Sequence, residues 1–257
     1  MDEFARRRPP APKNLYNIPS RMSKKIRIVV CGAAGRMGRR VAALAAEDGR
    51  FQVAALIGRC ATQDCLAPDA LPRALSEADA LIDFTAPEAA VRFVQAAAQA
   101  RKPAVVGTTG LSAVEQAQIK ACSRRIPVFM TPNFSPGVHV LGALARQAAA
   151  LLKEYEASLS EIHHSLKKDA PSGTALRLAR IVVAARGGVE PAIVSQRIGD
   201  IAGEHTLTLA GPCERIELTH RAHCRDVFAR GALRASLWLA GRKPGLYDMP
   251  DLLAGKP

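Results

Sequence analysis

The side chains best suited to catalysis are concentrated in one polar stretch, residues 161–175, which reads EIHHSLKKDAPSGTA. His163 and His164 can each transfer a proton near neutral pH. Lys167 follows four residues after His163 and adds a positive charge. A single histidine is usually structural, but two histidines and a lysine beside a predicted helix start favour a catalytic site for an anionic substrate.

The end of the same stretch is suited to binding a carboxylate. Ser172, Gly173 and Thr174 precede an Ala-rich segment that predicts a helix over 175–185, and Ser172 or Thr174 can cap it. The backbone N–H groups at a helix start attract anions. Such a segment is usually only a cap, so the prediction that it binds substrate depends on the neighbouring histidines and lysine.

A second candidate site is the glycine-rich segment GAAGRMG at 32–38, which directly follows a β-branched run at 26–30. Gly32, Gly35 and Gly38 permit a tight turn and a close approach of the backbone. The helix that follows offers free N–H groups to a pyrophosphate. In this strand–turn–helix context the spacing predicts dinucleotide binding; the alternative is a tight turn without a ligand.

The end of the next predicted strand, 51–57, bears on which nucleotide is bound. A carboxylate usually stands there to bind the ribose 2′-OH, but the sequence at 56–59 reads LIGR. Arg59 can instead bind a 2′-phosphate, with help from Arg36 in the glycine-rich segment. We therefore expect NADPH to be preferred over NADH; the alternative is that Arg59 is a solvated surface charge.

Two further strand ends are expected at the same crevice, because ligands of open parallel sheets lie beyond the carboxyl ends of the strands. Phe84 ends one predicted strand, and Gly107, Thr108 and Thr109 follow another. We expect these residues beside the nicotinamide and its ribose, although each pattern alone also suits an ordinary turn.

The elements that must position these residues alternate between strand and helix up to about residue 134. Strands are predicted at 26–30, 51–57, 80–84, 103–106 and 128–130, and helices at 35–48, 85–100 and 112–123, the second of which begins with a capping box at 85–88. This alternation predicts a parallel sheet covered on both faces. Later elements, at 138–152, 156–162, 203–209, 215–222 and 226–240, predict a second, α+β unit.

The composition favours a globular protein whose partners are small anions. Apolar residues make up 48% of the 257 residues, and the formal net charge is +13. A basic chain can bind nucleic acid, but no nucleic-acid motif occurs and aromatic residues do not alternate with basic ones. We expect no nucleic-acid partner, and no membrane partner because no apolar run reaches the roughly 18–20 residues that span a bilayer.

The six cysteines include no C-x-x-C pair, and the chain start lacks a secretory pattern. We therefore expect reduced cysteines and a cytoplasmic protein. A zinc site at His223 and Cys224 has no ligand-pair spacing behind it, so no metal is expected. Residues 1–24 are rich in proline and charge and are expected to be a disordered tail or a gene-start artefact.

Eight short segments follow one another along the chain in a fixed order: GAAGRMG, DFT, GTTG, NFS, HHSLKKDAPSGTA, GEHT, ERIELTH and GLYDM. With them, residues 25 to 254 resemble the dihydrodipicolinate reductases, and the HHSLKKDAPSGTA segment is the most specific of the set. The resemblance implies a Rossmann-type doubly wound parallel sheet with a second α+β domain. It further implies a dinucleotide-binding domain at 25–134, completed by 232–257, and a substrate-binding and oligomerisation domain at 135–231.

The resemblance also implies roles for individual residues. His163 would be the proton donor, Lys167 its partner on the bound substrate and His164 a substrate-binding neighbour. Gly173 and Thr174 would hold a substrate carboxylate. Cofactor contacts would come from Gly32, Arg36, Met37, Gly107, Thr109, Thr131, Asn133 and Phe134.

The implied reaction is the reduction of 4-hydroxy-tetrahydrodipicolinate to tetrahydrodipicolinate, in lysine and diaminopimelate biosynthesis. NAD(P)H would deliver hydride to a conjugated carbon of a dianionic cyclic imine, and His163 would protonate the resulting enamine. A homotetramer built through the second domain is expected. The alternatives are another two-domain nicotinamide dehydrogenase or a non-catalytic NADPH sensor, neither of which needs the histidine–lysine cluster. The chain departs from the family in lacking the acidic residue at the strand end and in its short segment at 60–80.

Overall fold

The structure is a computed structural model that describes residues 24–59, 64–188 and 190–255. The expectation for residues 1–24 therefore falls, apart from Lys24, outside the described part of the chain. Within that part, no helix is long and apolar enough to cross a membrane.

The first sheet has six strands, all parallel. Its spatial order is β10 (Gly245–Tyr247), β5 (Pro127–Met130), β4 (Ala104–Val106), β3 (Ala80–Asp83), β1 (Ile26–Cys31) and β2 (Phe51–Ile57). The central strands are buried on both faces, which explains their uninterrupted apolar sequences. Since all strands run the same way, their carboxyl ends meet at one edge.

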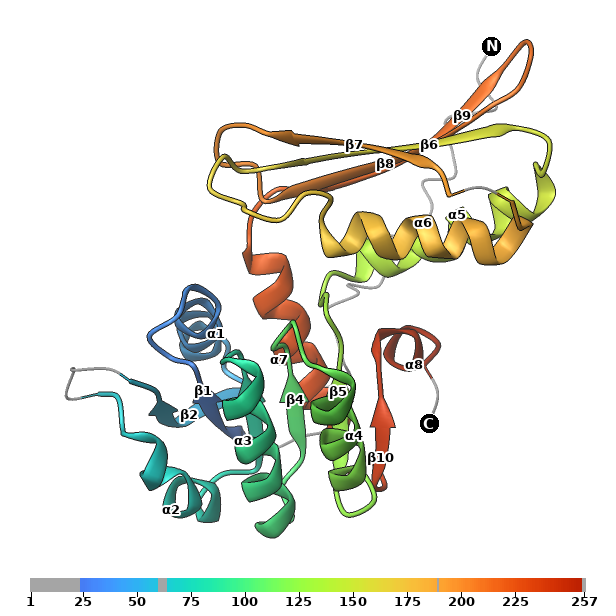
Figure 1. The fold of residues 1–257 in the computed structure, drawn as a ribbon. Coiled ribbons are helices and arrows are strands. Elements are labelled where there is room, and N and C mark those ends of the chain that lie inside the picture. The colour runs from blue at the N-terminus through green and yellow to red at the C-terminus, as the bar shows by residue number, and fades with distance from the viewer. Residues whose placement is uncertain (1–23, 60–63, 189, 256–257) are drawn as a thin grey trace, which may run out of the picture.

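Helices cover both faces of this sheet, so the predicted doubly wound arrangement is confirmed (Figure 1). One face packs against α1 (Arg36–Glu47) and α7 (Asp226–Leu239), and the other against α2 (Leu71–Ser76), α3 (Pro87–Gln99) and α4 (Ala113–Cys122). A short 3₁₀ turn, Pro68–Ala70, leads into α2. The crossover helices bring each chain segment back to begin the next parallel strand.

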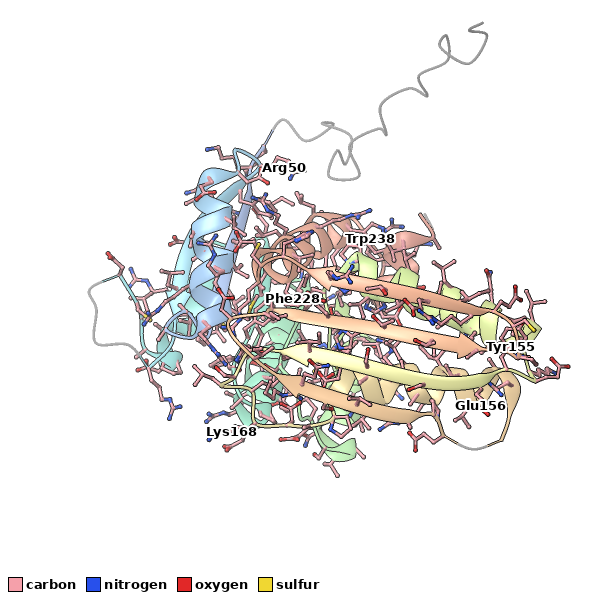
Figure 2. All side chains as sticks on the ribbon, turned by 90° about the horizontal axis from the view of Figure 1, so that it is seen from above. Arg50, Tyr155, Glu156, Lys168, Phe228 and Trp238 are labelled. Carbon is pink, nitrogen blue, oxygen red and sulfur yellow. The ribbon has the colours of Figure 1, made fainter. Side chains whose placement is uncertain are left out.

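The second sheet is mixed, as predicted for an α+β unit. Its order is β7 (Ala192–Arg197), β6 (Glu156–His163), β8 (Gly203–Ala210) and β9 (Arg215–Ala222), with only the β6–β7 pair parallel. One face packs on α5 (Pro136–Leu151) and α6 (Gly173–Arg186). These helices lie between the two sheets in Figure 1, whereas the view onto the other face shows no helix across it (Figure 2).

The chain passes between the two units twice. The segment after β5 leads directly into α5, and α7 returns from the second sheet to the first. The chain then adds β10 beside β5 and ends the described part with α8 (Met249–Leu253). The C-terminal segment therefore completes the first sheet and not the second.

Besides the short 3₁₀ turn, four elements were absent from the sequence expectations: α2, β7, β10 and α8. β10 has three residues, and β7 is an edge strand whose residues are half-buried or exposed, so neither carries a clear apolar period. The capping box predicted at 85–88 is wrong. The N-cap of α3 is Ala86, and the Thr85 hydroxyl donates to Asp83 instead.

The expectation of reduced cysteines holds for Cys31, Cys122, Cys213 and Cys224. It is wrong for Cys65, which is disulfide-bonded. Cys60 lies outside the described residues. The prediction failed because it relied on the absence of a C-x-x-C pair, and that test says nothing about pairs at other spacings.

Candidate active site

The glycine-rich loop packs closely against the end of β3. Gly32 has φ +79°, and a Cβ there would lie 2.3 Å from the carbonyl oxygen of Phe84. A Cβ on Gly38 would lie 2.2 Å from the oxygen of Gly32. Both positions therefore require glycine, which allows α1 to begin directly at the sheet edge.

The start of α1 is suited to a pyrophosphate. Its N-cap, Gly35, provides no side-chain cap, and the first turn contains no acidic residue. The first N–H groups of the helix are thus available to an anion, which the helix dipole also attracts. This uncapped start fits the nucleotide that the sequence predicts.

A cavity of about 630 Å³ lies in front of this loop. Four predicted cofactor residues line it: Gly32, Gly35, Arg59 and Phe84. Glu88 and Arg92, one turn apart on α3, line it as well and were not singled out from the sequence. The other predicted cofactor residues are not among its lining residues: Arg36, Met37, Gly38, Gly107, Thr108, Thr109, Thr131, Asn133 and Phe134.

The loops after β3 and β4 are joined by a buried carboxylate. Asp83 accepts hydrogen bonds from the hydroxyls of Thr108 (2.6 Å) and Thr85 (2.7 Å). The backbone N–H of Thr85 donates in turn to the Thr108 hydroxyl (2.9 Å). The ring of Phe84 occupies the space that a Cβ on Gly107 would need. Thr108 is therefore a buried link between two loops.

Asp83 makes stability depend on pH. Burial raises the pKa of its carboxyl to about 6, although the two hydroxyls oppose the rise. Between the usual pKa near 4 and this value, the folded state binds more protons than the unfolded state, so the free energy of unfolding falls as the pH rises. Two pKa units correspond to a loss of about 3 kcal/mol by pH 7.

We expect the variant Asp83→Asn to lack the pH-dependent loss of stability that Asp83 causes. Its free energy of unfolding should therefore decline less than that of wild type from pH 4 to 7. Urea denaturation across that range measures the difference. The exposed Asp200→Asn serves as the control and should keep the wild-type slope. Equal slopes for wild type and Asp83→Asn would contradict the assignment.

The segment after β5 connects the two units at the site. The side-chain Nδ2 of Asn133 donates to the hydroxyl of Thr174, at 3.2 Å. The backbone carbonyl of Asn133 accepts from the hydroxyl of Thr131, at 2.9 Å. Phe134 is 2% exposed, and its ring packs against those of Phe84 and Phe129. The side chain of Phe134 therefore belongs to the core, and only its backbone can face a ligand.

The start of α6 is capped by Ser172, one of the two caps predicted. Its hydroxyl accepts from the N–H of Ala175 (3.2 Å) and lies 3.2 Å from Nε2 of His205. Ser172 is 2% exposed, so it supports the helix start from inside the protein. Apart from its chain neighbours and the backbone of α6 itself, no atom of the described residues lies within 4 Å of the position of a Cβ on Gly173, so an anion can approach the first N–H groups there.

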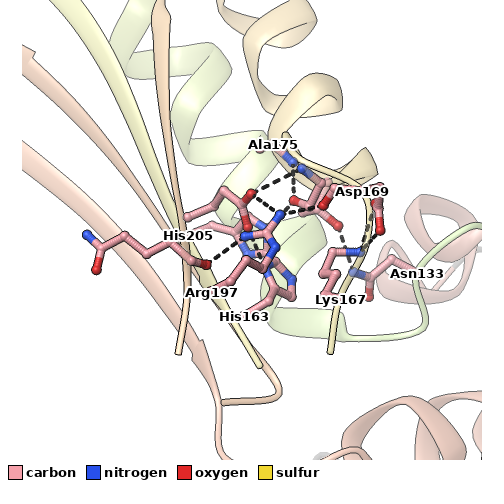
Figure 3. A network of polar contacts seen from close by, with 11 residues as sticks. Asn133, His163, Lys167, Asp169, Ala175, Arg197 and His205 are labelled. Atoms are coloured by element: carbon pink, nitrogen blue, oxygen red, sulfur yellow. Dashed lines mark hydrogen bonds and ion pairs between the residues drawn. The ribbon is translucent and has the colours of Figure 1, made fainter. Parts of the chain in front are cut away.

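Strand pairing gathers four polar side chains on one face of the second sheet (Figure 3). Glu161 and His163 are two residues apart on β6 and so point the same way. In register with them, Arg197 on β7 stands opposite His163, and His205 on β8 stands opposite Glu161. Glu161 bonds Nδ1 of His163 and, at 2.7 Å, the guanidinium of Arg197.

The two imidazoles in this cluster differ in their surroundings. The rings of His163 and His205 pack edge to face, 5.1 Å apart. Burial lowers the pKa of His205 to about 3, so this ring is neutral at physiological pH. Burial also lowers the pKa of His163, but the adjacent Glu161 acts in the opposite direction. His163 is thus the imidazole that can carry a proton.

Lys167 reaches the same region from the loop after β6. Its Nζ contacts both carboxylate oxygens of Asp169, at 2.7 and 2.8 Å (Figure 3). The side chain of Asp169 is 60% exposed, whereas that of Lys167 is 21% exposed. The sequence pointed to the lysine but not to its pairing with Asp169.

His164 lies near cations from both units. Burial lowers the pKa of its imidazole, and so do the positive charges of Arg225, Arg36, Lys167 and Arg197, in decreasing order. The first is the N-cap of α7 and the second begins α1, whereas the third lies in the loop after β6 and the fourth on β7. The glycine-rich loop and the histidine cluster therefore border the same strongly positive region, which suits two anionic ligands.

Glu161, His163 and His205 also offer three ligand atoms within 4.8 Å of one another. The guanidinium of Arg197 already binds the carboxylate of Glu161, however, and a second cation beside it would be repelled. The arrangement therefore suits a network of hydrogen bonds rather than a metal ion.

Sequence reasoning missed Glu161, Arg197, His205, Arg225 and Arg92 as site residues. Glu161 could have been found, because the period of two along a strand places it on the face of His163. Arg225 immediately precedes the last predicted helix and follows the ERIELTH segment. Arg197 and His205 carry no local signal, since their place depends on which strands pair.

Comparisons with known proteins agree with this geometry. The family model described as dihydrodipicolinate reductase, N-terminus, matches residues 26–134, and the one described as dihydrodipicolinate reductase, C-terminus, matches residues 137–253. Relatives named 4-hydroxy-tetrahydrodipicolinate reductase include one from Anaeromyxobacter dehalogenans (strain 2CP-1), 40% identical, and one from Thiobacillus denitrificans, 42% identical. The matches cover 88% and 90% of this chain and 97% and 99% of those proteins.

A solved structure of similar fold is the dipicolinate-bound dihydrodipicolinate reductase from Paenisporosarcina sp. TG-14. It superposes with a TM-score of 0.74 over 88% of this chain and 98% of the other, at 19% sequence identity, which supports the fold. The family models together span nearly all the described residues, and the two relatives match over at least 97% of their own length. The chain therefore belongs to the dihydrodipicolinate reductase family.

Proposed function

We propose that this protein is an oxidoreductase that reduces 4-hydroxy-tetrahydrodipicolinate to tetrahydrodipicolinate with NAD(P)H, in lysine and diaminopimelate biosynthesis. In the balanced reaction, the cofactor provides a hydride, a proton is taken up and one water is lost. The observation that carries the proposal is that His164, next to the His163 cluster, lies near the positive charges of Arg36 at the glycine-rich helix start and of Arg225. A nucleotide on the helix start and a dianionic substrate at the histidines can therefore meet in this positive region.

Within this proposal, the bound nicotinamide supplies the hydride, and the protein orients the substrate and supplies the proton. His163 donates the proton to the reduced substrate. His164, Lys167 and the N–H groups of Gly173 and Thr174 hold the substrate carboxylates, and Ser172 stabilises that helix start. Gly32, Gly35 and the start of α1 would hold the pyrophosphate.

The remaining predicted cofactor residues fit the same proposal by their positions. They belong to the loops at the carboxyl ends of the parallel strands or to the glycine-rich helix start, and they comprise Arg36, Met37, Gly38, Phe84, Gly107, Thr108, Thr109, Thr131, Asn133 and Phe134. Thr108 and Phe134, both buried, shape these loops and contribute backbone groups.

The proposal is tested by mixing the purified protein with NADPH and with the product of the synthase that makes 4-hydroxy-tetrahydrodipicolinate. Loss of NADPH absorbance, with tetrahydrodipicolinate identified by mass spectrometry, is expected. Nucleotide binding without turnover would favour a non-catalytic sensor. Turnover with an amino acid or a sugar alone would favour another nicotinamide dehydrogenase.

We further propose that NADPH is preferred, because Arg59 and Arg92 line the cavity where a 2′-phosphate would lie and no carboxylate ends β2. We expect Arg59→Ala to raise the KM for NADPH about tenfold while changing the KM for NADH little, since a charge-assisted hydrogen bond contributes about 1.5–3 kcal/mol. Steady-state kinetics with each cofactor in turn measures the change in the two KM values.

The control for this prediction is Arg124→Ala, which removes an exposed arginine that does not line the cavity. It should leave both KM values unchanged. Equal effects of Arg59→Ala on the two cofactors, or a wild-type preference for NADH, would mean that Arg59 does not contact the 2′-phosphate.

We also propose that residues 25–134 with 232–257 bind the nucleotide, whereas 135–231 bind the substrate and mediate assembly into a homotetramer. The second sheet supports this, because one of its faces is covered by α5 and α6 and the other by no helix in the view of Figure 2. Light scattering should give a mass about four times the 27.4 kDa of one chain. A mass of one chain at micromolar concentration would contradict assembly.

A further inference from the structure

One buried charge has no place in the mechanism described so far. The side chain of Glu161 is fully buried, and its two oxygens have three partners: Nδ1 of His163, the guanidinium of Arg197 at 2.7 Å and the N–H of Ser172 at 3.2 Å. A carboxylate removed from water is costly unless each oxygen is hydrogen-bonded. Here the hydrogen bonds are satisfied, and one of them fixes the catalytic histidine.

The contact with Glu161 determines which nitrogen of His163 meets the substrate. An ionised carboxylate can only accept hydrogen bonds, so the hydrogen between the two groups belongs to Nδ1. Nε2 is then the atom that can exchange a proton with a ligand. Among the described residues Nε2 has no hydrogen-bond partner, and a Cβ on Gly203 would lie only 2.9 Å from it. The glycine therefore leaves space beside Nε2.

Arg197 keeps the carboxylate in its ionised form. Burial alone would raise the pKa of Glu161, but the hydrogen bond from Arg197 and the neighbouring His163 lower it overall. Without this cation, a buried carboxylate beside an imidazolium would tend to take the proton itself. Arg197 also donates to the backbone carbonyl of Asp169, which ties the Lys167 loop to the same pair.

The charged and titratable groups that face His163 are Glu161 on its own strand, Arg197 on β7, His205 on β8 and Lys167 on the following loop. Two of these are cations that disfavour a protonated imidazole, and His205 is neutral. Glu161 is the one anion in the set. It therefore opposes the two cations and keeps His163 able to hold the proton that it must donate.

We propose that Glu161, clamped by Arg197, is the positioning residue that fixes the hydrogen of His163 on Nδ1 and presents Nε2 to the substrate. The inference rests on the proposed function, in which His163 is the proton donor. Glu161 does not touch the substrate and acts only through the imidazole. Its charge should therefore be visible in the titration of His163 itself, even without substrate.

The test compares Glu161→Gln with wild type in the full-length protein. Glutamine keeps an oxygen that can accept from Nδ1 but removes the charge. We expect the pKa of His163, followed by NMR of ¹³C,¹⁵N-histidine-labelled protein, to fall by about one pH unit or more. The chain has six histidines, and His163→Gln identifies the signal. At pH 8 kcat should fall about tenfold with little change in KM, and the alkaline limb of its pH profile should move to lower pH.

Arg197→Gln gives an opposite prediction and is informative even if Glu161→Gln does not fold. Removing this cation should let the coupled pair of Glu161 and His163 hold its proton to higher pH, so the alkaline limb of kcat and the titration seen at the His163 ring should move to higher pH. A purely structural defect would lower kcat in both variants without opposite shifts. Asp79→Asn, which breaks the Arg27–Asp79 ion pair in the first sheet, is the matched control and should change neither titration nor kcat.

Two results separate this inference from the proposed function. If wild type turns over the substrate but the titration of His163 is the same in Glu161→Gln, the positioning role of Glu161 is overturned. If wild type shows no turnover while the titration shifts as expected, the proposed reaction fails and the coupling of Glu161 to His163 stands.

Discussion

Replacing His163 with glutamine should lower kcat about 10²–10⁴-fold, the usual contribution of a general acid. His163 donates its proton only as the transition state forms, so its loss should leave ground-state binding and the KM nearly unchanged. Glutamine is similar in size and can still contact Glu161, which keeps the cluster packed. Steady-state kinetics from pH 6 to 9 measures the effect.

The pH dependence of the wild-type enzyme provides an internal check. Burial lowers the pKa of His163 in the free protein, while a bound dianion should raise it again. Activity is lost as the pH rises through the pKa of the donor, so the alkaline limb of kcat should lie at higher pH than that of kcat/KM. Near-normal turnover of His163→Gln at all pH values would assign the proton to another donor.

Replacing Lys167 with alanine should raise the KM for the substrate and also slow turnover. A charged hydrogen bond to a carboxylate is worth about 1.5–3 kcal/mol, which corresponds to a loss of about tenfold to a hundredfold in kcat/KM. The loss should be enlarged because Asp169 would then stand unpaired beside an anionic substrate. NADPH affinity, measured by fluorescence titration, should not change.

Two neighbouring variants make the Lys167 prediction specific. Lys168→Ala removes the neighbouring, exposed lysine and should leave the KM for the substrate unchanged. It removes the same charge as Lys167→Ala, so it shows whether the effect depends on the position of Lys167 rather than on the charge of the loop. Asp169→Asn should free Lys167 and lower the KM or leave it unchanged. If Lys167→Ala lost NADPH binding instead, the loop would have a structural role and not a role in substrate binding.

Local sequence patterns determined the first sheet and the positions of most residues proposed for the site. Apolar runs separated by helical periods predict parallel strands, and the glycines at 32, 35 and 38 mark the loop at their edge. His163, Lys167 and the cap at Ser172 are close in the chain, so their proximity follows from sequence spacing alone. The failed capping box at 85–88 shows the limit of such patterns, because Asp83, hidden between two loops, competes for the same hydroxyl.

Only the tertiary structure decided which groups surround the proposed proton donor. Arg197 and His205 lie more than thirty residues along the chain from His163, and no local pattern marks them. They reach it because β7 and β8 pair with β6 in a register that puts their side chains on one face. A shift of one residue in either strand would turn those side chains to the other face. The charge environment of His163 is thus a property of non-local strand pairing, which the sequence encodes only through the whole fold.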